Sequence, residues 1–316
     1  YSKNLLNRYD TDFKILLRNI NSYGDLSSTY KENEDYKFLG SALLNLKYPL
    51  LKSFEGGAKS YLTPLVSFRY SPNSGLNLDQ YETLIKFEDL FKLDRINNKT
   101  IEKGNATTFG VEYKRLNSYD NEDFKLGIGV NLRNTIDQDL PISSSLGEKT
   151  SDIIGYSGFN ITENFSFDYN FSIDNDLSTF ENNDITLKFS VNNLISTFGF
   201  SEANGEMGDS NVIGNETLLK INDNNYFTFS TRRNRKINLT EYYDLVYEYK
   251  NDCLTAGVKY KKTYYEDREL KPSENLFFKI SISLLLSKHI FFKILVISNF
   301  FNEFFSYAFI YCFACN

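Results

Sequence analysis

Residues 123–133 read Asp-Phe-Lys-Leu-Gly-Ile-Gly-Val-Asn-Leu-Arg, a stretch in which apolar side chains alternate with polar or small ones throughout. The apolar set is Phe124, Leu126, Ile128, Val130 and Leu132, and the other set is Lys125, Gly127, Gly129, Asn131 and Arg133. A β-strand places successive side chains on opposite faces. The stretch therefore predicts a ribbon with one apolar face and one hydrophilic face.

The same alternation recurs along the chain. Residues 164–174 place Phe165, Phe167, Tyr169 and Phe171 on one face. Further ribbons are predicted at 109–114, 185–191, 243–250, 254–261 and 276–283, and weaker ones at 12–20, 36–48, 61–71, 151–161, 194–201 and 225–233. Short gaps that contain Asn or Asp, such as 162–164 and 250–252, favour hairpins and hence antiparallel pairing. The pattern predicts an all-β antiparallel protein of roughly 12–14 strands.

Three features favour a transmembrane β-barrel over a soluble sandwich. The better ribbons run to about 10 residues, the length that crosses a bilayer at a tilt. Their apolar faces carry almost no charge, whereas the opposite faces carry groups that need water. A sandwich of so many two-faced strands would need a very large core. A secreted or surface β-sandwich of adhesin-like kind stays the alternative, and it would bury Phe165, Phe167, Tyr169 and Phe171 against a second sheet.

Composition limits the chemistry of the chain. Its 316 residues are 41% hydrophobic and 16% aromatic, with a mean hydropathy of −0.40. A net charge of −6 gives no reason to expect nucleic acid, which attracts strongly basic surfaces. With His289 as its one histidine, the chain offers neither a histidine-based triad nor a multi-histidine metal site. We therefore expect no enzymatic activity, no cofactor and no metal.

Three groups of segments, in this order, resemble a known family. The first contains Tyr48-Pro49-Leu50-Leu51-Lys52 and Ser71-Pro72-Asn73. The second contains Phe87-Glu88-Asp89-Leu90-Phe91 and Asp94-Arg95. The third runs from Tyr247 to Cys253 and continues through Asp267-Arg268-Glu269-Leu270-Lys271-Pro272 to Phe278-Lys279-Ile280. Together they resemble the barrel domain of the LptD family of lipopolysaccharide-assembly proteins.

The resemblance implies a function at the cell outer membrane. A barrel of this family places lipopolysaccharide (LPS) in the outer leaflet by opening sideways between its first and last strands. A small LptE-like lipoprotein plugs the lumen, and a periplasmic Lpt bridge delivers the lipid through an N-terminal jellyroll. Because the sequence starts at Tyr1 without a signal peptide, we expect a fragment that lacks the jellyroll and the first gate strand. An outer-membrane porin or channel stays an alternative on the same architecture.

The resemblance and the alternation together define candidate sites. Cys253 matches the family's C-terminal cysteine, which implies a disulfide with an N-terminal one. The cations expected to face the lumen and to contact LPS phosphates are Lys125, Arg133, Lys188, Lys259 and Lys261. Strand Asn275–Leu284 is expected to close the barrel and to form one side of the gate, with Phe278, Ile280 and Ile282 on its apolar face. The basic run Arg232, Arg233, Arg235 and Lys236 is interpreted either as a lipid-phosphate surface or as a solvated loop end.

The last residues break the pattern. We predict a partial barrel over 1–284 and a separate tail over 285–316, which is rich in Phe and lacks alternation. Lys288, Lys293 and Glu303 interrupt any apolar helix long enough to span a bilayer. Cys312 and Cys315 have metal-like spacing but lack a second ligand pair. We expect this tail to be irregular or helical and interpret it as a frameshifted or misjoined end.

Overall fold

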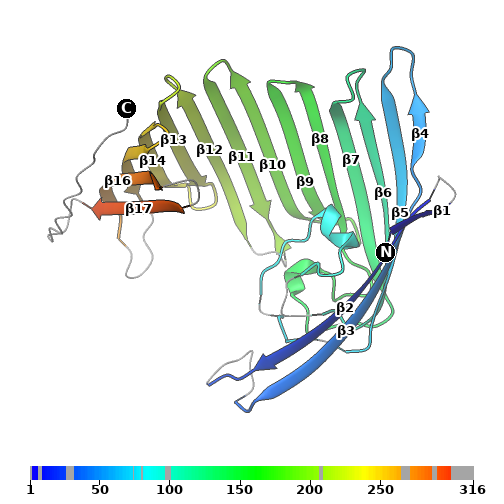
Figure 1. Cartoon of the computed structure of the whole chain (residues 1–316). Helices are drawn as coiled ribbons and strands as arrows, with labels where there is room; N and C mark the ends of the chain where they lie inside the picture. The colour runs from blue at the N-terminus through cyan, green and yellow to red at the C-terminus, as the bar shows by residue number, and fades with distance from the viewer. Residues whose placement is uncertain are drawn as a thin grey trace. The chain divides into compact units, whose positions relative to one another are not determined.

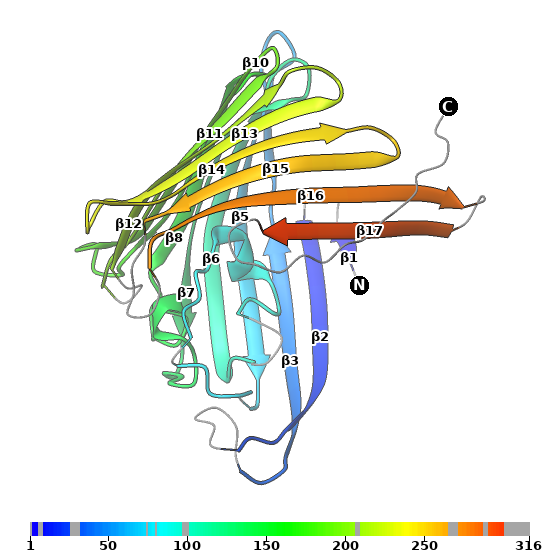
Figure 2. The same cartoon turned by 90° about the vertical axis from the view of Figure 1, so that its left-hand side faces the viewer.

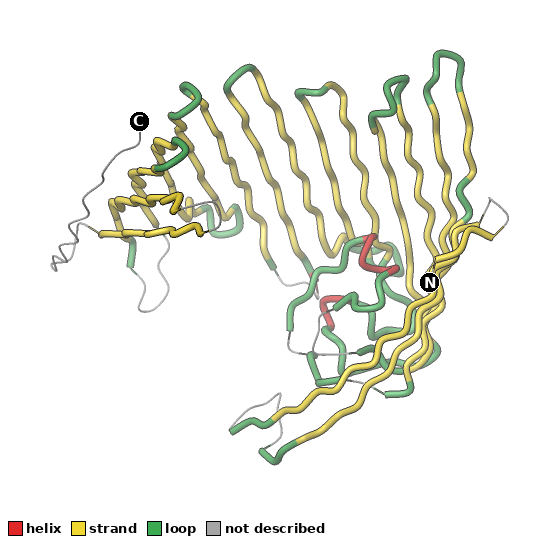
Figure 3. The backbone as a smooth tube through the Cα atoms, viewed as in Figure 1, coloured by secondary structure: helices red, strands yellow, loops and turns green. Residues whose placement is uncertain are grey.

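The computed structural model describes residues 2–5, 9–25, 32–73, 75–79, 81–96, 101–205, 209–264, 271–286 and 290–299. These residues form strands joined by turns and loops, with only two short 3-10 helices (Figures 1 and 3). The chain divides into two compact units, which are described separately. Unit 1 comprises Tyr1–Ile185 and Ser201–Ser210, and unit 2 comprises Thr186–Phe200 and Asn211–Asn316.

Unit 1 is an antiparallel sheet whose strands mostly pair with their neighbours in sequence. Its strands are β1 (Ser2–Leu5), β2 (Tyr9–Ser22), β3 (Asp35–Lys47), β4 (Leu50–Ser53), β5 (Lys59–Ser71), β6 (Gly104–Leu116), β7 (Glu122–Arg133), β8 (Ile153–Thr162), β9 (Phe165–Ile173) and the first half of β10 (Phe180–Val191). Both β3 and β4 pair with β5. The break between β3 and β4 contains Pro49 and lies opposite Pro64 of β5. Proline has no backbone N–H to donate, and both prolines lie where the pairing with β5 is interrupted.

Unit 2 continues the antiparallel pattern. It contains the second half of β10, most of β11 (Leu194–Ala203), β12 (Ser210–Lys220), β13 (Asn225–Asn234), β14 (Leu239–Lys250), β15 (Leu254–Thr263), β16 (Ser273–Leu286) and β17 (Ile290–Asn299). From β12 onward each strand pairs with the next, as Figure 2 shows for β14 to β17.

The described residues form seventeen strands, which is more than the 12–14 that the sequence predicts. Four of them escaped the alternation criterion, namely β1, β4, β12 and β17. The strand β17 corrects the prediction of an irregular or helical tail over 290–299. Its sequence Ile-Phe-Phe-Lys-Ile-Leu-Val-Ile-Ser-Asn is a run of β-branched and aromatic residues, which favours a strand even without alternation. Residues 300–316 lie outside the described part.

Two connections of unit 1 fold onto one face of its sheet. The connection from β5 to β6 carries helix η1 (Phe87–Phe91), and the connection from β7 to β8 carries η2 (Ile142–Ser144), both red in Figure 3. Helix η1 packs on β7 and β8. The buried apolar cluster forms where these connections meet the sheet, and it contains Leu65, Ile85, Phe87, Leu90, Phe91, Leu140, Leu146, Ile154 and Tyr156. The core of unit 1 is therefore built by long connections covering the sheet.

Glycines make this close packing possible. A Cβ atom added at Gly127 would lie 2.3 Å from the Tyr156 ring, and one at Gly110 would lie 2.7 Å from the Phe91 ring. Real Cβ atoms do not approach other atoms so closely. Added Cβ atoms at Gly127 and Gly129 of β7 would also lie 3.0 Å from Phe87 and 3.0 Å from Leu90, so Gly110 of β6 and these two glycines form the surface on which η1 packs.

Candidate functional site: a loop-covered polar face

The two faces of the sheet in unit 1 differ as the alternation predicts. On one face of β7, Leu126 and Ile128 are 41% and 39% exposed. On the other face, Asn131 is fully buried beneath the connections, and Arg133 is 7% exposed. The apolar side chains of β7 thus lie outside and its hydrophilic ones inside. A β-sandwich would require a second sheet packed on this apolar face. In the described part of unit 1, no second sheet covers Leu126 and Ile128.

An aromatic row crosses the outer face near one end of the strands. Tyr113, Phe124, Phe159 and Phe167 lie on β6, β7, β8 and β9, with successive ring centroids 5.7, 4.7 and 5.9 Å apart. Membrane barrels carry such aromatic belts where the apolar band meets the lipid headgroups. The row therefore indicates one border of an apolar band whose exposed members include Phe68, Phe109, Leu126, Ile128 and Leu132.

Loop lengths give the sheet an orientation. The turn between β6 and β7 covers 117–121 and that between β8 and β9 covers 163–164, at the end that bears the aromatic row. The connections at the opposite end cover 72–103 and 134–152. Outer-membrane barrels have short turns on the periplasmic side and longer loops outside the cell. By this rule the covering connections belong to the extracellular end.

Side chains from the inner face anchor the connection that carries η1. Arg69 of β5 donates to the carbonyl oxygens of Lys92 and Leu93, the latter at 2.5 Å. Asn45 of β3 donates to the carbonyl oxygen of Phe91 at 3.0 Å. These bonds satisfy carbonyl groups at the end of η1 that the short helix leaves unpaired. The sheet thus fixes the backbone of the connection as well as its side chains.

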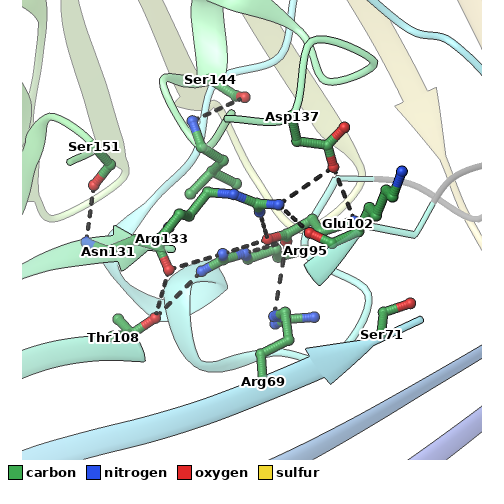
Figure 4. A network of polar contacts seen from close by, with 12 residues as sticks. Arg69, Ser71, Arg95, Glu102, Thr108, Asn131, Arg133, Asp137, Ser144 and Ser151 are labelled. Atoms are coloured by element: carbon green, nitrogen blue, oxygen red, sulfur yellow. Dashed lines mark hydrogen bonds and ion pairs between the residues drawn. The ribbon is translucent and has the colours of Figure 1, made fainter. Parts of the chain in front are cut away.

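A buried charge network joins the connections to the sheet (Figure 4). Glu102 lies at its centre and accepts from Arg95 Nη2 at 2.6 Å and from Arg133 Nη1 at 3.1 Å. Its Oε1 lies 3.8 Å from Arg69 Nε. Burial alone would raise the pKa of Glu102, but attraction by Arg95, Arg69 and Arg133 outweighs burial and holds it at about 2. Glu102 is therefore charged at neutral pH.

The network extends across several strands. Arg95 also donates to Asn131 Oδ1 of β7 at 3.0 Å, and that oxygen accepts from Thr108 of β6 at 3.1 Å. The neighbouring Asp94 accepts from Arg18 of β2 at 2.8 Å. Two adjacent residues of one connection therefore contact β2 on one side and β6 and β7 on the other. This arrangement braces the intervening strands from within.

A small cleft remains open on the inner face beside η1. Its volume is about 220 Å³, and its walls include Lys86, Glu88, Tyr156 and Asn170. Lys125 lies at its edge, where Nζ is 3.2 Å from Asp168 Oδ1 and 5.9 Å from the centroid of the Tyr156 ring. The cleft is polar and of balanced charge, with an aromatic wall.

The predicted lumen cations have different surroundings. Arg133 is buried in the charge network and does not face an open lumen, because the connections from β5 and β7 cover it. In unit 2, Lys188 is exposed on β10. Lys259 pairs with Asp244 at 2.9 Å, and Lys261 Nζ lies 5.5 Å from the centroid of the Tyr242 ring. Lys125 and Arg133 belong to unit 1, and the other three lysines belong to unit 2.

The predicted gate strand and cysteine also have defined positions. Strand β16 pairs with β15 along one edge and with β17 along the other, so it is not the last strand as expected. Phe278 lies opposite Val258, Ile280 is 46% exposed, and the side chain of Ile282 lies outside the described part. Cys253 is half-buried in the turn between β14 and β15, where its N–H donates to Asn251 Oδ1 at 3.0 Å.

Sequence reasoning missed the centre of the network. No pattern in the sequence marks Arg69, Glu102 and Asp137, because single charges in strand ends and loops are normally solvated. One signal was present, since Phe87–Phe91 and Asp94-Arg95 are the segments that carried the family resemblance. In the structure these segments supply the apolar anchor, the contact to β2 and the contact to Glu102.

A second buried carboxyl predicts pH-dependent stability of unit 1. Burial raises the pKa of Asp152, just before β8, to about 6; repulsion from Glu181 and Asp174 adds to this, and a hydrogen bond from Ser172 opposes it. A raised folded-state pKa gives stability that is complete below about pH 3.8 and is lost as pH rises through about 6. We expect the unfolding free energy to fall by up to about 3 kcal/mol over that window.

Urea unfolding at pH 4 to 7 measures this effect. Asp152→Asn should flatten the decline over that window, whereas Glu163→Gln, in the exposed turn between β8 and β9, should preserve it. An equal decline in Asp152→Asn and the unchanged protein would show that another group is responsible.

These features define a class of protein: an antiparallel all-β membrane sheet of the outer-membrane β-barrel kind, with an apolar outer face and a polar inner face. No helix in the part of the chain that the structure describes is long and apolar enough to span a membrane. The family model LptD, LPS transport system D, matches residues 18–211, which is more than half of the chain. The chain therefore belongs to the LptD family, which points to the outer membrane of Gram-negative bacteria.

Other comparisons add distant likenesses. A mutant of the Rhodopseudomonas blastica porin is 11% identical with a TM-score of 0.37, and the match covers 93% of each chain. The ferric-catecholate import receptor Fiu from Escherichia coli K12 is 14% identical with a TM-score of 0.39, over 89% of this chain and 54% of that one. No curated protein matches the chain.

Proposed function

We propose that this chain is part of the wall through which LPS reaches the outer leaflet of the outer membrane. The observation that carries the proposal is the two-faced sheet of unit 1, which lies largely within the segment that matches the LptD family. Its outer face suits acyl chains, and its inner face offers polar groups to a hydrated sugar headgroup. Lys125, Lys188, Lys259 and Lys261 are candidate contacts for LPS phosphates on this route.

The covered inner face argues against free diffusion. In unit 1, the connections over 72–103 and 134–152 occupy the extracellular end and are held by buried charges. A diffusion porin needs a water-filled passage along its inner face. A covered face is better suited to a protein that moves one large substrate and otherwise stays closed.

Partners and the disulfide are part of the same proposal. We infer an LptE-like plug lipoprotein and a periplasmic Lpt bridge that delivers LPS through an upstream jellyroll. The turn that holds Cys253 is at the end of unit 2 with the shorter connections, 221–224 and 251–253, which favours the periplasm. An oxidising periplasm permits the proposed disulfide. Lateral opening beside Phe278, Ile280 and Ile282 would require β16 to separate from β15 or from β17.

Depletion of the protein in its own cells tests the function. We expect newly made LPS to disappear from the cell surface, measured by its modification by an enzyme that acts only in the outer leaflet. Uptake of small hydrophilic solutes should not fall. Unchanged surface LPS together with reduced solute uptake would contradict the proposal and favour a porin.

A further inference from the structure

One end of the strands in unit 2 carries a cluster of exposed cations, here called the basic rim. It consists of Arg233 at the end of β13, Arg235 and Lys236 in the turn to β14, and Lys262 near the end of β15. Arg233, Arg235 and Lys236 are exposed. These three residues lie at the C-terminal end of β13 and in the turn that follows it. The rim is therefore adjacent to the apolar parts of β13, β14 and β15.

Strand register places two of these cations on the apolar face. Arg233 lies opposite Ile213 and Lys262 lies opposite Tyr243 in the antiparallel ladders. Directly opposed residues point to the same side of a sheet. Ile213 and Tyr243 are 42% and 37% exposed on that side. Arg233 and Lys262 therefore extend from the face that we assign to the bilayer.

Aromatic rings support the rim. The guanidinium carbon of Arg235 lies 5.9 Å from the centroid of Phe200, and Lys262 Nζ lies 5.4 Å from that of Tyr264. The rings of Tyr264 and Tyr243 meet edge to face at 5.9 Å. Basic and aromatic side chains together are typical of the level at which lipid headgroups lie.

Among the described residues of the rim and their ion-pair partners, positive charges outnumber negative ones. Glu241 pairs with Arg232 at 2.9 Å, and Glu274 lies 3.6 Å from Lys262. Among the described residues, Arg233 and Arg235 form no ion pair, although Arg233 donates to Asn238 Oδ1. Two guanidinium groups therefore remain for an external anion, and a guanidinium matches the geometry of a phosphate group.

Loop lengths assign the rim to one leaflet. The end of unit 2 at which the rim lies bears the four-residue turn 235–238 and the longest connection of the unit's described strands, 264–272, whereas the opposite end bears the turns 192–193, 221–224 and 251–253. Longer connections lie outside the cell in outer-membrane barrels. This end therefore faces the outer leaflet.

We propose that the basic rim binds the phosphate groups of a glycolipid in the outer leaflet. The acyl chains of that lipid lie along the apolar face beside Ile213, Tyr243 and Phe229, whose ring stacks on that of Tyr243 with centroids 6.2 Å apart. The site is on the outer wall and so differs from the polar route inside. The proposal rests on the proposed function only for the identity of the membrane in which the chain lies. The site would hold LPS after the lipid has left the lumen.

Lipid binding in nanodiscs tests the proposal. The full-length protein in phosphatidylcholine nanodiscs is titrated with bisphosphorylated lipid A and, separately, with enzymatically dephosphorylated lipid A. We expect tighter binding of the phosphorylated form. Each of Arg233→Gln, Arg235→Gln and Lys262→Gln should weaken it about fivefold, equivalent to about 1 kcal/mol, and the triple variant about 100-fold.

Lysines at the opposite end of the strands provide the matched control. Lys220→Gln together with Lys250→Gln removes two cations near the short turns and should leave the affinity unchanged. Equal binding of the two lipid A forms, equal weakening by the control, or full competition by inorganic phosphate would each overturn the proposal. If the triple variant does not fold, the single variant Arg235→Gln, in an exposed turn, decides the question.

The readout separates this inference from the proposed function. Binding in nanodiscs requires no transport. Phosphate-dependent binding in a protein whose depletion leaves surface LPS unchanged would preserve the rim and reject the transport function. A triple variant that exports LPS normally and binds phosphorylated lipid A as tightly as the unchanged protein would leave the transport function standing and reject the rim as a binding site.

Discussion

Replacing Glu102 with Gln is expected to lower the free energy of unfolding by about 3–5 kcal/mol, because it leaves buried arginines without their counter-charge. Glu102 is 3% exposed and contacts Arg95, Arg133 and Arg69. Asp137, which lies 3.4 Å from Arg133 Nη2, and Asp94, which pairs with Arg18, are the other carboxylates of the network. The three guanidinium groups would then lose the one carboxylate that all of them contact, in a site shielded from water.

Urea unfolding of the protein in lipid vesicles measures this loss. Glu88→Gln is the matched control, because Glu88 lies on the same connection but is exposed. It should change the unfolding free energy by no more than about 0.5 kcal/mol. Because the pKa of Glu102 is held at about 2, the unchanged protein should lose the same contribution only as the pH falls from about 4.5 through about 2.

Limited digestion with trypsin shows where the loss occurs. The Arg95 side chain is fully buried, and its guanidinium bonds to Glu102 and to the carbonyl oxygen of Leu90. We expect Glu102→Gln to expose cleavage after Arg95 while the strands stay protected. Lower stability without new cleavage at Arg95 would mean that the network supports the sheet as a whole and does not hold the connection in place.

The strands could be predicted because their signal is local. Alternation in 123–133 needs only the residues of β7, and the structure places Leu126 and Ile128 outside and Asn131 inside as expected. The covering of the inner face could not be predicted in this way. Arg133 was expected to line a wet lumen, but Glu102, 31 positions away in the sequence, covers and binds it. Such a contact depends on how two long connections fold over the sheet, and the alternation of residues along a strand carries no information about that.

The last strands differ from β7, because their pairing is not recorded in an alternating pattern. Alternation identifies strands with one wet face, so β17 was missed because its sequence is apolar at nearly every position. The same omission made β16 look like the closing strand. Pairing is a property of two segments, and the ladder from Phe277–Asn299 to Leu286–Ile290 became visible only in the structure.

Replacing Ile128 with Lys is expected to destabilise the protein by about 2–4 kcal/mol in a bilayer, because a charge at the middle of the apolar band must enter hydrocarbon. Ile128 lies near the centre of β7 and is 39% exposed on the outer face. It lies opposite Gly155 on β8, and the ring of Phe171 occupies the place that a side chain at position 155 would take. A lysine here therefore has no acidic partner on the same face within the neighbouring pairs.

The matched control places the same side chain on the inner face. Asn170 lies near the centre of β9, opposite Tyr156, and lines the cleft that also contains Glu88 and Asp168. Asn170→Lys should cost less than about 1 kcal/mol, since its ammonium group reaches water and two carboxylates. The measurement is urea unfolding of both variants in lipid vesicles. Equal losses for the two variants would mean that the exposed apolar face does not contact lipid, and the membrane assignment of the sheet would then be wrong.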